Sequence, residues 1–252
     1  RMKLNGVCLH HDLGALGAAF NYRAMERRFE MLKEMGANAV RTSHNPPAPE
    51  FLDLADRMGF LVMDEAFDMW YAEKTEFDYA RFFNEWSETD IQDMVTRDRN
   101  HPSIIIWSIG NEVPQAGDLT VAGRLIDAVR EVDDTRAVGQ AFAAWAYHEN
   151  TAGIEDVVGL NYSPGLYDSQ HSTHPDWKFF GSETSSAVRS RGVYNGYNTQ
   201  CSSYDDHIVG WGQTAEDSWR DVNTRDWIAG EFIWTGFDYI GEPTPYEWPA
   251  KS

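Results

Sequence analysis

The segment IIIWSIGNE, residues 104–112, holds the first group in this sequence that could do chemistry. An apolar run from Ile104 to Trp107 leads within a few residues to a carboxylate, Glu112. A second glutamate, Glu183, ends another apolar stretch, FFGSE. Burying a carboxylate costs several kcal/mol unless the group is paired or neutralised. Two acids that each follow a buried strand therefore indicate a catalytic use.

Two opposed glutamates are what double-displacement glycoside hydrolysis requires. One carboxylic acid protonates the leaving oxygen while the other carboxylate attacks the anomeric carbon, with the two groups about 5 to 5.5 Å apart. Apolar neighbours such as Trp107 and Ile109 would help to hold Glu112 protonated, and Arg41 would favour the charged, nucleophilic form of Glu183. The pair is therefore predicted to divide into an acid and a nucleophile.

Apolar, β-branched stretches alternate with helical patterns along the chain, which is typical of parallel βα units. Eight strands are predicted, at Leu4–Leu9, Ala39–Thr42, Phe60–Asp64, Ile104–Ile109, Ala137–Gln140, Val157–Tyr162, Phe179–Glu183 and Gly230–Thr235. Helices are predicted at Tyr22–Met35, Pro49–Arg57, Trp86–Arg99 and Val121–Val132. This order indicates one α/β domain, a (β/α)8 TIM barrel over residues 1–252, whose strands end at a common rim.

Polar residues gather at the predicted ends of these strands. Besides the two glutamates, the residues taken as binding candidates are His10, Arg41, His44, Asp64, Asn111, Tyr162 and Trp234. A single polar residue at a strand end is as often a loop-capping hydrogen bonder as a binding group. The pair of glutamates on separate strands is the stronger signal.

Five segments carry a resemblance to a known family: GVCLHHD, MGANAVRTSHNPP, GFLVMDEAFDMW, RNHPSIIIWSIGNE and GEFIWTGFDYIGEPTPY. In this order, and over nearly the whole chain, they resemble the catalytic barrel of glycoside hydrolase family 2, most of all its β-galactosidases. The resemblance implies a retaining, exo-acting hydrolase that removes terminal non-reducing β-D-galactose through a covalent glycosyl-enzyme.

The resemblance also implies a role for each matching residue. Glu112 would be the general acid/base and Glu183 the nucleophile. Asn111 would bind the sugar 2-hydroxyl, Arg41 would orient the nucleophile, and Tyr162 would donate a hydrogen bond to it.

The remaining binding roles concern the sugar itself. By resemblance His10 and His44 would contact sugar hydroxyls, and Trp234 would form the apolar floor of the subsite for the terminal sugar. Trp70 and Trp145 are further candidates for sugar contact, because the apolar face of a pyranose fits an indole ring.

The sequence departs from the family pattern at several places. Some members hold magnesium through a Glu and a His after the third strand, but Met69 and Tyr71 stand there in DEAFDMWY. We expect no metal at that site and no cofactor. Ser186 stands where some members carry a sugar-contacting His. The chain also stops soon after the eighth strand, so we expect it to be a fragment of a longer multidomain enzyme that lacks its last helix and follows β-sandwich domains.

Composition limits the partners. The formal net charge of −19 argues against nucleic acid, which needs clustered Lys and Arg. No apolar run approaches the roughly 18 to 20 residues of a membrane span, so a soluble protein of undetermined compartment is expected, with no membrane partner. Cys8 and Cys201 stand far apart, which predicts neither a disulfide framework nor a zinc site. The expected partner is a β-galactoside or related oligosaccharide, and a homo-oligomer is possible.

Other functions stay open at this point. β-Glucuronidase and β-mannosidase activity share the same pair of carboxylates, although no Asn-x-Lys clamp for a uronate follows the eighth strand. A non-catalytic carbohydrate-binding barrel is the alternative from another class. The retention of both Glu112 and Glu183 weighs against it, because binding alone does not need two opposed acids.

Overall fold

The computed structural model describes residues 2–13, 16–188, 192–195, 202 and 209–239. Its strands form a closed parallel barrel in chain order, β1 to β8, in which β8 pairs with β1. The strands are β1 (Leu4–Leu9), β2 (Ala39–Thr42), β3 (Leu61–Glu65), β4 (Ile104–Asn111), β5 (Ala137–Ala143), β6 (Val158–Asn161), β7 (Phe179–Ser185) and β8 (Gly230–Trp234). The predicted TIM barrel is confirmed.

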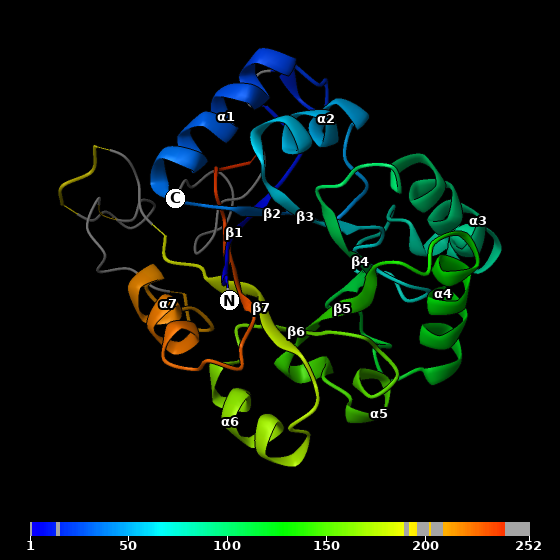
Figure 1. Cartoon of the computed structure of the whole chain (residues 1–252). Helices are drawn as coiled ribbons and strands as arrows, with labels where there is room; N and C mark the ends of the chain where they lie inside the picture. Colours follow the sequence, from blue (N-terminus) through cyan, green and yellow to red (C-terminus); the bar gives the residue numbers. More distant parts are fainter. Residues whose placement is uncertain (1, 14–15, 189–191, 196–201, 203–208, 240–252) are drawn as a thin grey trace.

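Helices surround the barrel as an outer ring (Figure 1). They are α1 (Tyr22–Met35), α2 (Pro49–Met58), α3 (Ala80–Asp98), α4 (Leu119–Val132), α5 (Glu149–Ala152), α6 (Pro164–Thr173) and α7 (Ala215–Asn223), with a 3-10 turn, η2, at Ala144–Ala146. Helix α1 has the bounds that its sequence pattern predicts, whereas α3 begins six residues earlier than predicted. The expected absence of a last helix concerns the chain after β8, most of which lies outside the described residues.

Local sequence explains how the first βα unit forms. Met25, Phe29 and Leu32 recur at helical spacing, and all three are buried against the barrel. The side chain of Asn21 accepts a hydrogen bond from the backbone N–H of Ala24 and so caps the helix start. Gly36 ends the helix with φ at 96°, a left-handed conformation that glycine adopts without steric cost. The chain then turns directly into β2.

Two hydrophobic clusters support the fold. The larger cluster lies between the strands and the helices. The smaller cluster lies inside the barrel and includes Met63, Phe180 and Phe232. Because side chains alternate along a strand, one strand can contribute to both clusters, as β7 does with Phe179 and Phe180. Polar side chains lie near the carboxyl ends of the strands, above the inner cluster. None of the described helices is both long enough and apolar enough to cross a membrane.

Candidate active site

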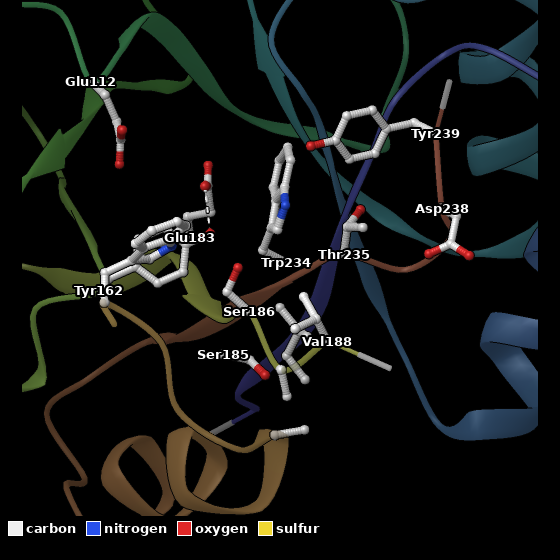
Figure 2. A pocket seen from close by; sticks show the side chains of 14 residues that line it. Glu112, Tyr162, Glu183, Ser185, Ser186, Val188, Trp234, Thr235, Asp238 and Tyr239 are labelled. Atoms are coloured by element: carbon white, nitrogen blue, oxygen red, sulfur yellow. Dashed lines mark hydrogen bonds between the residues drawn. The ribbon is translucent and has the colours of Figure 1, made fainter. Parts of the chain in front are cut away.

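The two glutamates predicted to act together do share one pocket. Glu112 and Glu183 line a cavity of about 520 Å³ at the carboxyl ends of the strands, and Figure 2 shows both carboxyl groups at the same side of it. Asn161, at the end of β6, lies between them. Its Nδ2 donates to Glu112 Oε1 at 3.0 Å and lies 3.4 Å from Glu183 Oε2. The two oxygens are therefore no farther apart than the sum of these distances.

The orientation of Asn161 is itself fixed. Ser182 on β7 donates its hydroxyl to Asn161 Oδ1 at 2.6 Å, so that the amide nitrogen faces the two acids. Both Asn161 and Ser182 are fully or almost fully buried. A buried polar network with its partners satisfied holds its members in one arrangement. The spacing of the two glutamates is thus set by side chains of β6 and β7.

Glu112 stands at the turn that follows β4. Its φ is 44°, an uncommon value for a residue other than glycine, and its N–H donates to Ala141 O of β5 at 2.8 Å. Burial raises the pKa of Glu112, and the nearby negative charge of Glu183 raises it further. The group is therefore suited to hold a proton and to release it as an acid.

Glu183 is surrounded by donors. Arg41 Nη1 donates to its Oε2 at 2.8 Å, and the hydroxyl of Tyr162 donates to its Oε1 at 2.7 Å. Burial, followed by the negative charge of Glu183, raises the pKa of Tyr162, so the phenol keeps its proton. Both contacts present hydrogens to its oxygens and so hold the carboxyl group in one orientation.

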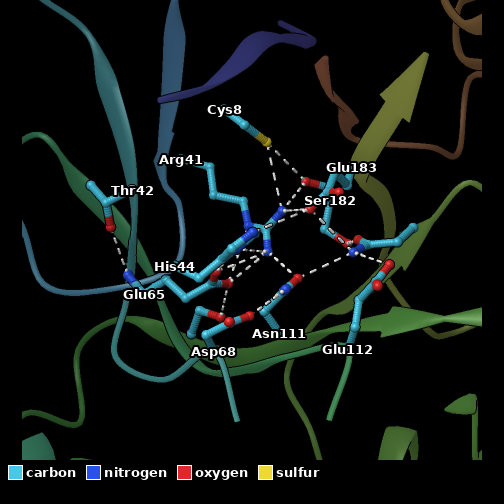
Figure 3. Close-up of polar contacts among 12 residues, drawn as sticks. Cys8, Arg41, Thr42, His44, Glu65, Asp68, Asn111, Glu112, Ser182 and Glu183 are labelled. Carbon is cyan, nitrogen blue, oxygen red and sulfur yellow. Dashed lines mark hydrogen bonds and ion pairs between the residues drawn. The ribbon is translucent and has the colours of Figure 1, made fainter. Parts of the chain in front are cut away.

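Arg41 is the centre of the polar network under the pocket (Figure 3). Its side chain is fully buried and donates to Glu65 on β3, with the shortest bond from Nη2 to Oε1 at 2.8 Å. It also donates from Nη2 to Asn111 Oδ1 at 2.7 Å. Although burial alone would raise the pKa of Glu65, the charge of Arg41 and bonds from His44 and Ser108 lower it. A charged Glu65 thus neutralises Arg41 and fixes its direction toward Glu183.

Aromatic rings form the wall on the side of β1 and β8. The rings of His44 and Trp234 are parallel with centroids 5.2 Å apart, and His44 Nδ1 lies 2.8 Å from Glu65 Oε1. His10 stacks on Tyr239 at 4.1 Å and meets Trp234 edge-on at 5.4 Å. Burial, assisted by the neighbouring His44, lowers the pKa of His10 to about 4, so His10 is neutral at physiological pH. A neutral imidazole can exchange hydrogen bonds with a hydroxyl.

Asn111, the residue before Glu112, is held by its own side chain. Its Nδ2 donates to Asp68 Oδ1 at 3.0 Å, and its Oδ1 accepts from Arg41 and from Asn161. Burial alone would raise the pKa of Asp68, but His44 and Lys74 lower it, so Asp68 is an ionised acceptor. Of the predicted site residues, Arg41, His44, Asn111, Glu112, Tyr162 and Glu183 are thus joined in one hydrogen-bonded network. His10 and Trp234 adjoin this network through ring contacts.

Asp64 does not belong to this group, so its assignment to substrate binding is withdrawn. Its side chain is fully buried on the outer side of β3, where Thr42 donates to its Oδ1 at 3.4 Å and Asp98 of α3 lies beside it. Because successive side chains of a strand point to opposite faces, the side chain of Glu65 points into the barrel and that of Asp64 points outward.

The two tryptophan candidates for sugar contact have different outcomes. Trp70 was wrongly chosen, because it is fully buried, donates Nε1 to Ile109 O at 2.8 Å and packs on Phe83. Trp145 is 67% exposed on η2, just after β5, and its contact with sugar stays a prediction.

Sequence reasoning did not select three residues of the site: Glu65, Asp68 and Asn161. The spacing in DEAFD holds a signal for the first two, because an inward Glu65 follows from strand alternation once Met63 is placed inside the barrel. Asn161 stands in GLNYSP immediately before Tyr162. Nothing in the sequence distinguishes an amide that bridges two acids from one that caps a loop.

The residues after β3 do not fit the magnesium ligands that the family resemblance implies for some members. Met69 is almost fully buried, and the hydroxyl of Tyr71 donates to Asp118 Oδ2 at 3.1 Å. A thioether and a phenol are poor ligands for a hard cation that prefers carboxylate oxygens. Within the described ranges, no group of three or more His, Cys, Asp or Glu side chains is placed to hold a metal ion.

Comparison with known proteins places this geometry in a family. The family model described as glycosyl hydrolases family 2, TIM barrel domain, matches residues 1–249. The chain belongs to glycoside hydrolase family 2. Among the curated relatives in this family, β-galactosidase BoGH2A of Bacteroides ovatus is 44% identical over 99% of this chain and 36% of that protein. The β-glucuronidase of Homo sapiens is 27% identical over 96% of this chain and 39% of that protein.

Solved structures of similar proteins agree with this result. A β-glycosidase from Bacteroides vulgatus matches with a TM-score of 0.84 and 33% identity, over 98% of this chain and 36% of that one. A family 2 member from Bacteroides cellulosilyticus matches with a TM-score of 0.80 and 39% identity, over 95% of this chain and 28% of that one. The chain therefore spans only 28% to 39% of the length of these relatives.

Proposed function

We propose that this chain is the catalytic barrel of a retaining, exo-acting β-galactosidase, which removes terminal non-reducing β-D-galactose. The observation that carries the proposal is the pair Glu112 and Glu183, bridged by one amide nitrogen of Asn161. Inverting enzymes need room for a water between their acids, which places the carboxyl groups about 6.5 to 9.5 Å apart. Two oxygens that share one nitrogen as donor fit the shorter separation of about 5 to 5.5 Å in retaining enzymes.

In the first step, Glu112 gives its proton to the glycosidic oxygen while Glu183 attacks the anomeric carbon. The bond to the leaving group breaks, and a covalent glycosyl-enzyme forms at Glu183. In the second step, the now ionised Glu112 takes a proton from water, whose oxygen displaces Glu183 from the sugar. Burial favours the proton that Glu112 must carry in the first step, and Arg41 holds the carboxyl group of Glu183 in place for attack.

A neutral sugar is favoured by the chemistry of the pocket wall. The described residues that line the pocket include Asp238 but no lysine or arginine. A uronate carboxylate in this space would face the negative charge of Asp238, and no lysine or arginine among the described lining residues would neutralise it, which costs free energy. Galactose in particular is supported by the 44% identity to the β-galactosidase of Bacteroides ovatus. Exo-action is supported by the aromatic wall of His10, Trp234 and Tyr239, which bounds one side of the subsite.

β-Glucuronidase activity is the second candidate, because the curated relatives include β-glucuronidases such as the human enzyme. β-Mannosidase activity shares the same acids but has no specific observation in its favour. A non-catalytic carbohydrate-binding barrel is disfavoured, because sugar binding alone gives no reason to raise the pKa of Glu112 beside a second carboxyl group.

A panel of aryl β-D-galactoside, β-D-glucuronide, β-D-mannoside and β-D-glucoside tests the proposal. We expect the galactoside to give the highest kcat/KM by at least about tenfold, a difference of about 1.4 kcal/mol in transition-state binding. A faster glucuronide would overturn the choice of sugar, and no turnover of any substrate would support a binding barrel. The product anomer, followed by NMR in the first minutes, tests retention. The panel is run on this chain and on the full-length protein, because preceding β-sandwich domains and a homo-oligomer stay predictions.

A further inference from the structure

A lysine in the loop between β3 and α3 reaches the end of β4. Lys74 Nζ donates to the backbone oxygen of Asn111 at 2.9 Å and to Asp68 Oδ1 at 2.8 Å. The oxygen of Asn111 belongs to the peptide bond that joins Asn111 to Glu112. Lys74 therefore contacts the peptide unit that carries the acid/base candidate, although Lys74 and Glu112 are 38 residues apart in the sequence.

Both polar groups of this peptide unit are bonded. Its carbonyl oxygen accepts from Lys74, and its N–H, which belongs to Glu112, donates to Ala141 O on β5 at 2.8 Å. Glu112 has φ at 44°, a conformation that costs free energy for a residue other than glycine and that surrounding contacts must maintain. Lys74 supplies one of the two bonds that oppose rotation of this peptide.

Asp68 couples the lysine to the side chain of Asn111. The same Oδ1 of Asp68 accepts from Lys74 Nζ and from Asn111 Nδ2, the latter at 3.0 Å. Asn111 is thus held at its carbonyl by Lys74 and at its amide by Asp68. The backbone of Lys74 is fixed in turn, because its N–H donates to Asp78 Oδ2 at 2.7 Å. The side chain is only 25% exposed, so solvent screens its charge incompletely.

We propose that Lys74 is a positioning residue, which holds the Asn111–Glu112 peptide so that Glu112 faces the leaving oxygen and which adds a fixed positive charge beside it. The inference rests on the proposed function. It gives the loop after β3 a role in positioning Glu112 at the end of β4, in addition to the contact of Asp68 with Asn111.

The charge of Lys74 has a direction that can be measured. The charged groups that act on Glu112 are Glu183 from β7, Arg41 from β2 and Lys74, and Tyr162 of the pocket wall is neutral. Burial and Glu183 raise the pKa of Glu112, while Lys74 and Arg41 lower it. An acid works only while protonated, so activity is lost as the pH rises through the pKa of Glu112. Removal of Lys74 therefore moves the alkaline limb of the pH profile of kcat to higher pH.

Three substitutions separate the effect of the hydrogen bond to Asn111 O from the effect of the positive charge. Lys74→Met removes both, and we expect kcat to fall ten- to a hundredfold with little change in KM, together with the shifted limb. Lys74→Gln can keep a hydrogen bond to the Asn111 oxygen without the charge, so we expect a smaller loss of kcat and the same shift. Lys74→Arg keeps the charge, and we expect the limb to stay at its parent position.

Lys33 provides the matched control. Its Nζ also donates to a backbone oxygen, that of Met58, at 2.9 Å, but it lies on α1 away from the pocket. Lys33→Met should leave kcat and both limbs unchanged. A Lys74→Met enzyme with a lower kcat but an unshifted limb would overturn the proposed charge effect, and one with parent kcat would overturn the positioning role.

A measurement without substrate keeps this test separate from the proposed function. The carboxyl carbon of Glu112 is titrated by NMR in protein labelled with ¹³C-glutamate, and its signal is identified by its loss in Glu112→Gln. We expect a higher pKa of Glu112 in Lys74→Met than in the parent or in Lys33→Met. If no glycoside is turned over but this shift appears, the proposed function fails while the coupling of Lys74 to Glu112 stands. An unchanged titration overturns the coupling whatever the substrate.

Discussion

Two neighbouring acids on β3, Asp64 and Glu65, are both fully buried, yet they lie in different layers of the molecule. Glu65 points into the barrel, where Arg41, His44 and Ser108 lie within hydrogen-bond distance of its carboxylate. Asp64 points to the helix layer. Burial and the nearby Asp98 raise the pKa of Asp64 well above its usual range, whereas the partners of Glu65 lower the pKa of that group.

The difference shows what each layer can use. Inside the barrel, Arg41, His44 and Ser108 keep Glu65 charged despite its burial, and charge at fixed positions is what catalysis requires. In the helix layer, burial and the neighbouring Asp98 favour the protonated form of Asp64. We therefore expect substitutions of inner acids to change activity, and substitutions of outer acids to change stability and its pH dependence.

The largest effect is expected at Glu183, the proposed nucleophile. Glu183→Gln removes the nucleophile while keeping the shape of the side chain, so we expect kcat on an aryl glycoside to fall about 10⁴-fold. The melting temperature should change little, because the amide oxygen can still accept from Arg41 and the amide N–H can donate to the hydroxyl oxygen of Tyr162. Activity within tenfold of the parent would contradict the assignment of Glu183 as nucleophile.

Glu65→Gln is expected to have the next largest effect. The substitution leaves Arg41, which is fully buried, without its main charge partner, and breaking a buried pair in this way costs about 3–5 kcal/mol. We expect a lower free energy of unfolding in urea, and also a lower kcat/KM, because Arg41 no longer has a fixed direction toward Glu183.

Asp64→Asn is the matched control, one residue away on the same strand. An amide can replace a protonated acid without loss of charge, so kcat/KM should stay within about twofold of the parent. If Asp64→Asn and Glu65→Gln lost activity equally, the distinction between the two layers would be wrong.

The same comparison explains how far the sequence could lead. Strand order and the βα alternation follow from hydrophobic periodicity, which depends on each segment alone. The choice between Asp64 and Glu65 depends on which face of β3 turns inward, and a one-residue error at a strand end reverses that choice. β3 was predicted as Phe60–Asp64 but runs from Leu61 to Glu65. This shift of one residue explains why Asp64 was selected in place of Glu65.

Some contacts in the site have no local sequence signal at all. Asn161 bridges Glu112 and Glu183, and Lys74 reaches Asn111, only because the closed barrel brings distant strand ends and loops together. The two glutamates were found because each ends an apolar stretch, and because the chain resembles a known family around them. Helices α6 and α7 are short and were not predicted.

The smallest effect sharpens the comparison on another strand. Glu231 on β8 also faces the helix layer, where Thr184 donates to it at 2.6 Å and its Oε1 has no hydrogen-bond partner in the described part of the chain. Burial raises the pKa of Glu231 from 4.5 to about 7, with Asp221 acting in the same direction and Thr184 against it. The folded protein therefore binds a proton that the unfolded chain releases between these pH values. Stability contributed by this proton is present below about pH 4.5 and is lost as the pH rises through about 7.

Glu231→Gln should remove that dependence, because an amide does not titrate. Between pH 5 and pH 8 we expect the free energy of unfolding of the parent to fall by roughly 2–3 kcal/mol more than that of the variant, measured by urea denaturation at each pH. Activity at pH 6 should be unchanged, since Glu231 lies outside the inner network. Parallel stability curves for the two proteins would mean that Glu231 is ionised in the folded state. The helix layer would then accommodate a charged acid. The presence of a buried charge would no longer distinguish the acids inside the barrel from those in the helix layer.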